Sequence, residues 1–222
     1  MILYLHGFAS GPASTKARYF VERAAKAGVT IHAPSLDEGE FRNLTVTRML
    51  ALVERLLGED DGPHVLIGSS LGGYLAALYA SRKPVEALVL MAPAIDYARR
   101  ITIAAGAAHE RWKRDGVIEV DHYALARKMP ISYGLIDDAG NHDPSPTVTA
   151  PSIVFQGLKD PVVPPEIVAD WTRVQPRATW VPLDSGHELT DVMDVIFDRS
   201  VRFLAELPAV AETWRPLVRA GP

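Results

Sequence analysis

The sequence contains no cysteine. This absence excludes disulfide bonds, zinc–thiolate sites and a thiol nucleophile, and it is compatible with a reducing compartment. The sequence also lacks an apolar run of the roughly 20 residues needed to cross a bilayer, so we expect no membrane span. Residues 1–7 read as a core strand, without the basic leader, apolar stretch and cleavage site of a secretory signal. We therefore expect a cytoplasmic protein.

Signals for nucleic-acid, metal and nucleotide binding are missing as well. The formal net charge is -4 and no long basic run is present, which gives no electrostatic support to nucleic-acid binding. No H-E-x-x-H or similarly spaced ligand cluster occurs. Residues 68–73 read G-S-S-L-G-G and lack both the G-K-[ST] ending of a phosphate-binding loop and the G-x-G-x-x-G of a dinucleotide fingerprint. We expect no cofactor and no metal, and the sequence leaves the oligomeric state open.

Short apolar runs alternate with helical patterns along most of the chain. A length of 222 residues with 48% hydrophobic content fits a single domain, residues 1–222, with one substantial core. The alternation is typical of an α/β fold, here a doubly wound, mostly parallel sheet of about six strands with helices on both faces. The apolar runs predict strands, and the helical periodicity predicts helices, at these positions: strands 2–5, 30–33, 65–67, 87–91, 152–155 and 179–183; helices 14–27, 44–57, 71–81, 165–173 and 189–207.

Residues 94–150 interrupt this alternation. They contain no clear strand, helical stretches at 97–107 and 123–128, and a turn-rich end at 136–146. A long insertion between two core strands is usually functional, for example as a lid or binding loop. We expect a small helical cap here, and a loosely held tail at residues 214–222.

The strongest chemical signal is the G-x-S-x-G pattern at residues 68–72. A short apolar strand precedes it and a helix rich in small residues follows. A sharp strand-to-helix turn of this kind can present the Ser70 hydroxyl for attack on a carbonyl. Gly68 and Gly72 would avoid collisions with the neighbouring strand or helix. The pattern also occurs in structural loops, but the flanking strand and helix favour a nucleophile.

A serine nucleophile needs a base, and the base needs an acid that orients it. Asp160 follows the strand at 152–155 and His187 follows the strand at 179–183, so the chain order is Ser70, Asp160, His187. That order is the one used by α/β-hydrolases. Asp160 could instead be only a turn residue before Pro161, and Asp184 competes for the acid role, although its closeness to His187 favours a part in shaping the loop.

Two backbone amides would complete an acyl-transfer site by binding the developing oxyanion. One belongs to Leu71, directly after the nucleophile, and the second to Phe8 in the loop after the first strand. Gly7 allows this loop to turn, and we expect His6 to brace it by hydrogen bonding. We expect His32, His64, His109 and His122 to be surface or packing residues. His142 lies at the end of the insertion.

Residues 4–17 (YLHGFASGPASTKA) and 68–74 (GSSLGGY) resemble the YqiA-like esterases. Residues 112–116, 157–160 and 185–187 are similar to abhydrolase-domain depalmitoylases and related serine hydrolases. The resemblance covers most of residues 1–207 and implies an α/β-hydrolase fold whose sheet begins at the family's third strand. It also implies the triad and the two oxyanion amides named above.

The resulting hypothesis is a serine hydrolase that cleaves a small-molecule carboxylic ester or thioester through an acyl-enzyme intermediate. A peptidase or amidase with the same triad is an alternative, because the same groups serve both reactions. A non-catalytic binding protein of the same fold is a further alternative. The natural acyl group and leaving group are not readable from the sequence.

Overall fold

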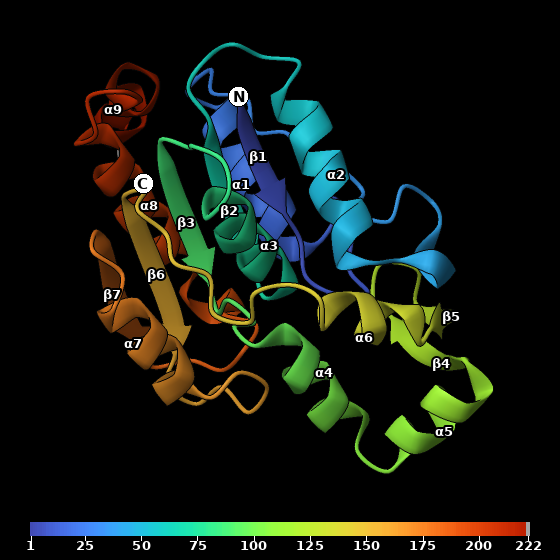
Figure 1. Cartoon of the computed structure of the whole chain (residues 1–222). Helices are drawn as coiled ribbons and strands as arrows, with labels where there is room; N and C mark the ends of the chain where they lie inside the picture. Colours follow the sequence, from blue (N-terminus) through green and yellow to red (C-terminus); the bar gives the residue numbers. More distant parts are fainter. Residues whose placement is uncertain (221–222) are drawn as a thin grey trace.

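The computed structural model describes residues 1–220 and has a five-stranded parallel sheet at its centre (Figure 1). The carboxyl ends of all five strands meet at one edge of the sheet, the lower edge in Figure 1. The prediction of these strands is confirmed, with boundaries that differ by at most two residues. In spatial order the strands are β1 (Ile2–Leu5), β2 (Val65–Ser69), β3 (Ala87–Met91), β6 (Ser152–Gly157) and β7 (Ala178–Leu183).

The predicted strand at 30–33 is wrong, because this segment forms only a single bridge between Leu3 and His32. The His32 N–H donates to the Ile2 carbonyl (2.9 Å), and the Tyr4 N–H donates to the His32 carbonyl (2.7 Å). Pro34 follows two residues later. Since proline has no N–H to donate to a ladder, the pairing along β1 ends there.

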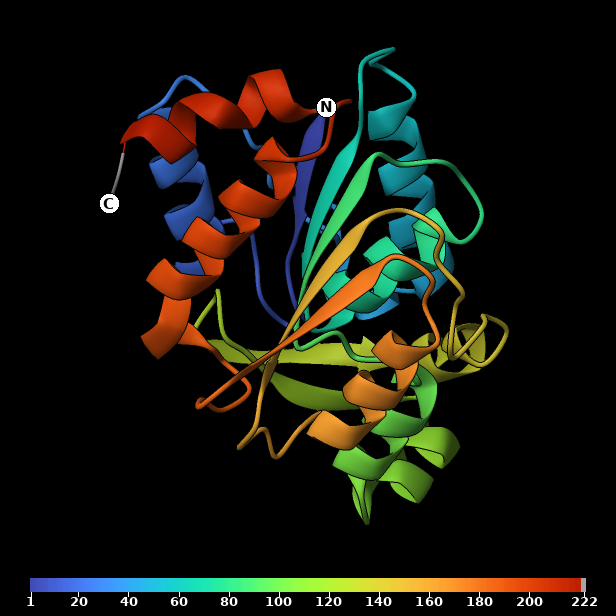
Figure 2. The same cartoon turned by 90° about the vertical axis from the view of Figure 1, so that its left-hand side faces the viewer.

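β1, β2, β3 and β6 are buried on both faces, which explains why these strands read as continuous apolar runs rather than alternating ones. Tyr4, Ile67 and their neighbours pack against α1 (Thr15–Ala25), α8 (Met193–Ala205) and α9 (Ala211–Ala220). Residues of the opposite parity pack against the helices of the other layer, which are α2 (Val46–Leu57), α3 (Leu71–Ala80) and α7 (Pro165–Arg173). Figure 2 shows the sheet between α1, α8 and α9 on one side and α2 and α3 on the other.

Capping residues set the starts of the first two long helices. The Ser14 hydroxyl accepts from the Ala17 N–H (3.4 Å) before α1, and the Thr45 hydroxyl accepts from the Arg48 N–H (3.1 Å) before α2. The predicted helix at 189–207 is divided into a 3-10 turn, η2 (Thr190–Val192), and α8. None of the helices formed by residues 1–220 is long and apolar enough to cross a membrane.

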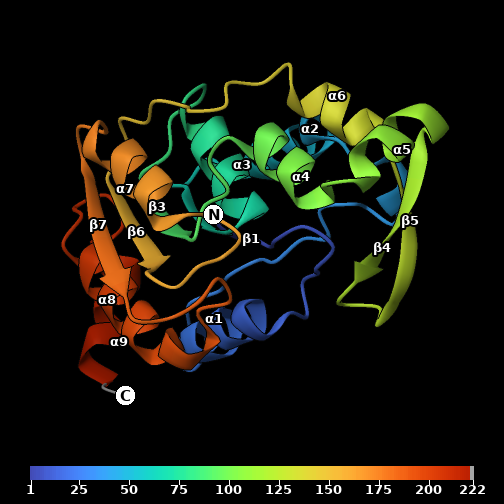
Figure 3. The same ribbon diagram turned by 90° about the horizontal axis from the view of Figure 1, so that it is seen from below.

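The insertion at 94–150 lies beyond the carboxyl ends of the sheet strands, and Figure 3 shows it from that side. Helices are present, as expected, but the expectation that the insertion contains no clear strand is wrong, because a β-hairpin lies at its centre. Residues 123–128, expected as a helix, form the turn of this hairpin and the start of its second strand. The insertion contains α4 (Tyr97–Ala105), α5 (Ala108–Asp115), β4 (Val117–His122), β5 (Arg127–Ser132) and α6 (Gly134–Ala139).

The expectation of a loose tail at 214–222 is also wrong for its described part. Residues 211–220 form α9, which packs against α8. Trp214 is only 1% exposed, and Leu217 lies three residues further along the same helix face. Burial of these two apolar side chains holds the segment on the domain. Residues 221–222 lie outside the described residues.

Candidate active site

Ser70 lies at a sharp turn between β2 and α3. Its backbone has φ +54° and ψ -116°, a conformation that costs a non-glycine residue about 1–3 kcal/mol. The flanking glycines make the turn possible. A Cβ at Gly68 would come within 2.4 Å of the Gly72 carbonyl oxygen, and one at Gly72 within 2.0 Å of the Leu5 carbonyl oxygen. The predicted close packing at both glycines is confirmed.

Backbone hydrogen bonds hold this strained turn in place. The Ser70 N–H donates to the Met91 carbonyl at the end of β3 (2.9 Å). The Ser70 carbonyl accepts from the Tyr74 N–H (3.1 Å) and from the Ala94 N–H (3.0 Å). Ser69, the neighbouring serine, is buried at the end of β2. The turn is therefore fixed both to the adjacent strand and to the first residue of the insertion.

The three side chains predicted to form a triad lie together at the carboxyl edge of the sheet. His187 Nδ1 is 2.8 Å from Asp160 Oδ2, and His187 Nε2 is 3.1 Å from Ser70 Oγ. A carboxylate only accepts hydrogen bonds, so Nδ1 carries the proton and Nε2 is free to accept from the serine hydroxyl. Each residue follows a different strand: Ser70 follows β2, Asp160 follows β6 and His187 follows β7.

The Asp160 carboxylate is fully buried and is surrounded by hydrogen-bond donors. Oδ1 accepts from the N–H groups of Val162 (2.8 Å) and Val163 (2.9 Å), so Asp160 also closes the turn in which it lies. Burial alone would raise its pKa. The hydrogen bond from His187, the charge of that ring when it is protonated, and the two backbone amides outweigh burial and hold the pKa of Asp160 below its usual range. The carboxylate is therefore ionised at neutral pH.

Sequence reasoning missed two residues behind this carboxylate. Gln156, in β6, is fully buried, and its Nε2 donates to Asp160 Oδ2 (3.0 Å). A Cβ at Gly157 would come within 2.3 Å of the Gly186 carbonyl oxygen, so only glycine lets the His187 loop approach this closely. The sequence signal that could have identified Gln156 and Gly157 is a polar residue and a glycine directly after the apolar run at 152–155.

The loop that carries His187 is tied down on two sides. The Lys159 N–H donates to the Ser185 carbonyl (2.9 Å), and Lys16 Nζ donates to the Glu188 carbonyl (2.8 Å). Burial lowers the pKa of Lys16, an effect that the nearby carboxylates of Glu188 and Asp160 oppose. Asp184, the competing candidate for the acid, is exposed and pairs with Lys159 (2.6 Å). The partner of His187 Nδ1 is Asp160 instead.

The loop after β1 lies directly against Ser70. A Cβ at Gly7 would be 3.5 Å from Ser70 Cβ, which is ordinary contact distance. His6 braces this loop, as expected: its Nε2 accepts from the Leu36 N–H (3.2 Å), and its Nδ1 donates to the Gly7 carbonyl (2.9 Å). Burial lowers the pKa of His6, which favours the neutral ring that this pair of bonds requires.

The two amides predicted to bind an oxyanion belong to this loop and to the elbow helix. The Leu71 N–H lies in the first turn of α3, where no carbonyl four residues earlier in the helix is present to accept it. The Phe8 amide follows Gly7, and the Phe8 ring packs against Phe41 with centroids 5.7 Å apart. A cavity of about 10 Å³ borders both residues and is otherwise mostly apolar; its lining comprises residues 6–10 with Leu36, Asp37, Phe41, Leu44, Met49 and Leu71.

Two features found in the structure lie away from this site. His142 contacts Thr47 and Arg82 (2.9 Å each), so it joins the end of the insertion to α2 and to the end of α3. A groove of about 610 Å³ lies between α1, α8 and α9, and none of the residues that line it belongs to the site.

Comparison with known proteins identifies the family of the chain. The model of the Uncharacterised protein family (UPF0227) matches residues 1–205. No curated protein sequence matches the chain.

Solved structures that are similar to this chain have the α/β-hydrolase fold. Alpha/beta hydrolase domain-containing protein 10 from mouse is 22% identical, with a TM-score of 0.77 over 93% of this chain and 90% of that one. A putative hydrolase from Agrobacterium vitis S4 is 23% identical, with a TM-score of 0.76 over 91% and 87% of the two chains. Est1E from Butyrivibrio proteoclasticus, solved with ferulic acid bound, is 18% identical, with a TM-score of 0.73 over 92% and 89%.

Proposed function

The chain belongs to the uncharacterised protein family UPF0227 and has the α/β-hydrolase fold, and from this starting point we propose that it is a serine hydrolase that cleaves a carboxylic ester or thioester. Two consecutive hydrogen bonds, from Asp160 through His187 to Ser70, carry the proposal. In this proposal residues 1–222 are one catalytic domain, with residues 94–150 as its cap.

Acylation would begin with attack of Ser70 Oγ on the substrate carbonyl carbon. His187 Nε2 takes the hydroxyl proton, and the Asp160 carboxylate stabilises the imidazolium through Nδ1. The carbonyl oxygen becomes negative and accepts hydrogen bonds from the Phe8 and Leu71 amides, each of which contributes about 3 kcal/mol to transition-state stabilisation. When the tetrahedral intermediate collapses, His187 donates its proton to the leaving oxygen or sulfur, and the acyl group stays on Ser70.

Deacylation repeats these steps with water as the nucleophile. His187 Nε2 accepts a proton from water, whose oxygen attacks the acyl carbon, and the same two amides bind the second oxyanion. Collapse of this intermediate breaks the bond to Ser70 Oγ and returns the proton from His187 to the serine. The products are a carboxylic acid and an alcohol or thiol, with the enzyme restored.

A fluorophosphonate probe tests the nucleophile directly. We expect the probe to label the protein once, at Ser70, as mapped by peptide mass spectrometry after digestion. Ser70→Ala should abolish labelling and the hydrolysis of p-nitrophenyl acetate while circular dichroism and thermal unfolding stay close to wild type. Labelling at another residue, or turnover retained in the folded variant, would contradict the proposal.

The leaving group needs a separate experiment. A panel of p-nitrophenyl esters, acyl thioesters and aminoacyl amides with the same acyl group distinguishes an esterase or thioesterase from an amidase. We expect ester and thioester hydrolysis to exceed amide hydrolysis, because an amine leaves less readily than an alkoxide or thiolate. Faster cleavage of amides would support the peptidase alternative instead.

A further inference from the structure

The turn of the β4–β5 hairpin, residues 123–126, contacts the loop that carries the Phe8 amide, residues 7–11. The Tyr123 N–H donates to the Ala9 carbonyl (2.8 Å). A second pair of residues meets between the same two segments: a Cβ added at Gly11 would come within 3.2 Å of Ala124 Cβ. Two consecutive residues of the hairpin turn therefore touch a loop more than 100 positions earlier in the sequence.

The accepting residue is conformationally strained. Ala9 has φ +52°, a value that non-glycine residues adopt only where surrounding contacts hold them. Its carbonyl lies one residue after Phe8. The Gly7 carbonyl, which precedes the Phe8 amide, accepts from His6 Nδ1 (2.9 Å) and from the Ser10 N–H (3.3 Å). His6 therefore holds the loop before the Phe8 amide, and the short bond from Tyr123 holds it after that amide.

Side-chain packing continues the same contact. The Phe41 ring lies 5.7 Å from the Phe8 ring and 4.6 Å from the His122 ring, which it meets edge-on. His122 is buried, and neither of its ring nitrogens has a partner among residues 1–220. The end of the hairpin therefore packs against the same ring as Phe8.

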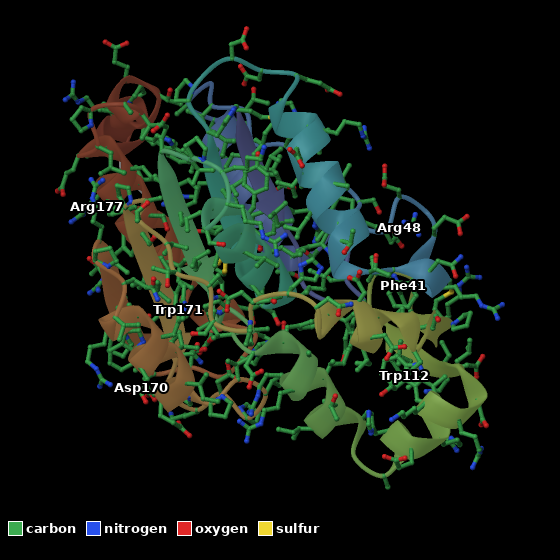
Figure 4. All side chains as sticks on the ribbon, in the orientation of Figure 1. Phe41, Arg48, Trp112, Asp170, Trp171 and Arg177 are labelled. Atoms are coloured by element: carbon green, nitrogen blue, oxygen red, sulfur yellow. The ribbon has the colours of Figure 1, made fainter. Side chains whose placement is uncertain are left out.

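A buried tryptophan on α5 also supports the hairpin. Trp112 Nε1, on α5, donates to the Ile131 carbonyl in β5 (3.0 Å). Figure 4 labels Phe41 and Trp112, which both lie near the hairpin. The hairpin therefore contacts both α5 and the 3-10 helix η1 (Phe41–Asn43), with its turn placed on the loop at 7–11.

We propose that the hairpin turn positions the oxyanion-binding loop, with the backbone N–H of Tyr123 as the positioning group for the Phe8 amide. This inference rests on the proposed serine hydrolase function and assigns the insertion a role in the chemical step. An oxyanion donor works only within about 2.7–3.1 Å of the oxygen that it binds. A displacement of about 1 Å can cost about 100-fold in rate, so a loop held from outside the sheet can limit turnover.

Tyr123→Pro removes the N–H together with an exposed ring. Proline requires a negative φ and favours an extended preceding residue; φ at 123 is not positive, and His122 lies in β4. We expect kcat for p-nitrophenyl acetate to fall about 10-fold to 100-fold with KM within about twofold, since the oxyanion donors act in the transition state. Tyr123→Ala, which keeps the N–H and removes a ring that is 78% exposed, is the matched variant and should stay within about twofold of wild type.

A second pair of variants tests the contact without proline. Gly11→Ala places a methyl group against Ala124, and Gly11 is not among the residues with positive φ, so the crowding is the main effect. We expect Gly11→Ala to lower kcat several-fold. The double variant Gly11→Ala/Ala124→Gly exchanges the methyl group across the contact and should restore kcat.

The outcomes separate this inference from the proposed function. If wild-type protein neither hydrolyses the ester nor is labelled at Ser70, the proposed function is wrong. If turnover depends on Ser70 but Tyr123→Pro matches wild type, or Tyr123→Ala loses as much kcat as Tyr123→Pro, the inference is wrong. Should Tyr123→Pro fail to fold by circular dichroism, the Gly11/Ala124 exchange decides, and a double variant no faster than Gly11→Ala overturns the inference.

Discussion

The two halves of the candidate site are held in place by different parts of the molecule. Ser70, Asp160 and His187 sit directly after sheet strands, and short backbone bonds between neighbouring loops fix them. The Phe8 amide lies in a loop whose outer contact is the hairpin of the insertion. The first half is therefore a property of the sheet, whereas the second depends on a segment inserted between two of its strands. Substitutions in each half should have separable effects on stability and turnover.

Removal of the nucleophile or the base should have the largest effect. We expect Ser70→Ala and His187→Ala to lower kcat for p-nitrophenyl acetate by on the order of 10⁴-fold to 10⁶-fold, because each removes a group that acts in both chemical steps. Ser69→Ala is the control, since Ser69 is buried beside the nucleophile but belongs to neither hydrogen bond of the relay. Single-turnover and steady-state rates of the three purified variants provide the measurement.

A change behind the triad should have the next largest effect. Gly157→Ala places a Cβ 2.3 Å from the Gly186 carbonyl oxygen, so the His187 loop must move away from Asp160. We expect kcat to fall about 100-fold, as for other displacements of about 1 Å in catalytic groups. Gly186→Ala is the matched control because nothing lies within 4 Å of its added Cβ. Equal loss in both variants would show that the close approach is not what matters.

Two buried tryptophans hold different parts of the insertion, one beside the hairpin and one near its end at residue 146, away from the oxyanion-binding loop. Trp112 Nε1 donates to the Ile131 carbonyl (3.0 Å) under the hairpin, and Trp171 Nε1, on α7, donates to the Pro146 carbonyl (2.9 Å). Figure 4 labels both side chains. Replacement of either by phenylalanine removes one hydrogen bond and leaves a carbonyl unpaired, for an expected loss of about 1–3 kcal/mol in the free energy of unfolding in urea. Only Trp112→Phe should also lower kcat, by several-fold, and equal losses of kcat would contradict the comparison.

The smallest expected effect is a pH dependence of stability in the triad half. The pKa of Asp160 is lower in the folded protein than its usual value, so ionisation of this carboxyl stabilises the fold above its unfolded pKa of about 4. That contribution is lost as the pH falls through the lower, folded value. The difference in unfolding free energy between wild type and Asp160→Asn should therefore be larger at pH 7 than at pH 3. Urea titrations at both pH values measure it, and a difference that grows on acidification would contradict the assignment.

The sequence predicts that Ser70, Asp160 and His187 lie close together, and it can do so because its signals are local. Gly68, Ser70 and Gly72 lie within five residues, and Asp160 and His187 each follow an apolar run that forms a strand of the sheet. Strand ends in a parallel sheet converge at one edge, so position along the chain translates directly into proximity. The distances from His187 Nδ1 to Asp160 Oδ2 (2.8 Å) and from His187 Nε2 to Ser70 Oγ (3.1 Å) could be obtained only from the structure.

The elements that were predicted wrongly depend on partners distant in sequence. Residues 117–122 are only partly buried, and their strand character comes from pairing with 127–132 rather than from a strong pattern of their own. Residues 30–33 have the composition of a strand, yet Pro34 ends the pairing after one bridge. Trp214 gives a clear apolar signal, but the surface of α8 that buries it is not visible in the local sequence.

The structure also shows why the sheet stops at five strands. β1 and β7 are its two edges, and an unpaired edge can recruit a strand from another molecule. β7 carries Pro182 within the strand, and the bridge beside β1 is closed off by Pro34. A proline cannot donate to a new ladder, so both edges resist extension by an added strand. Proline thus ends the expected strand at 30–33 and also protects the edges of the sheet from edge-to-edge aggregation.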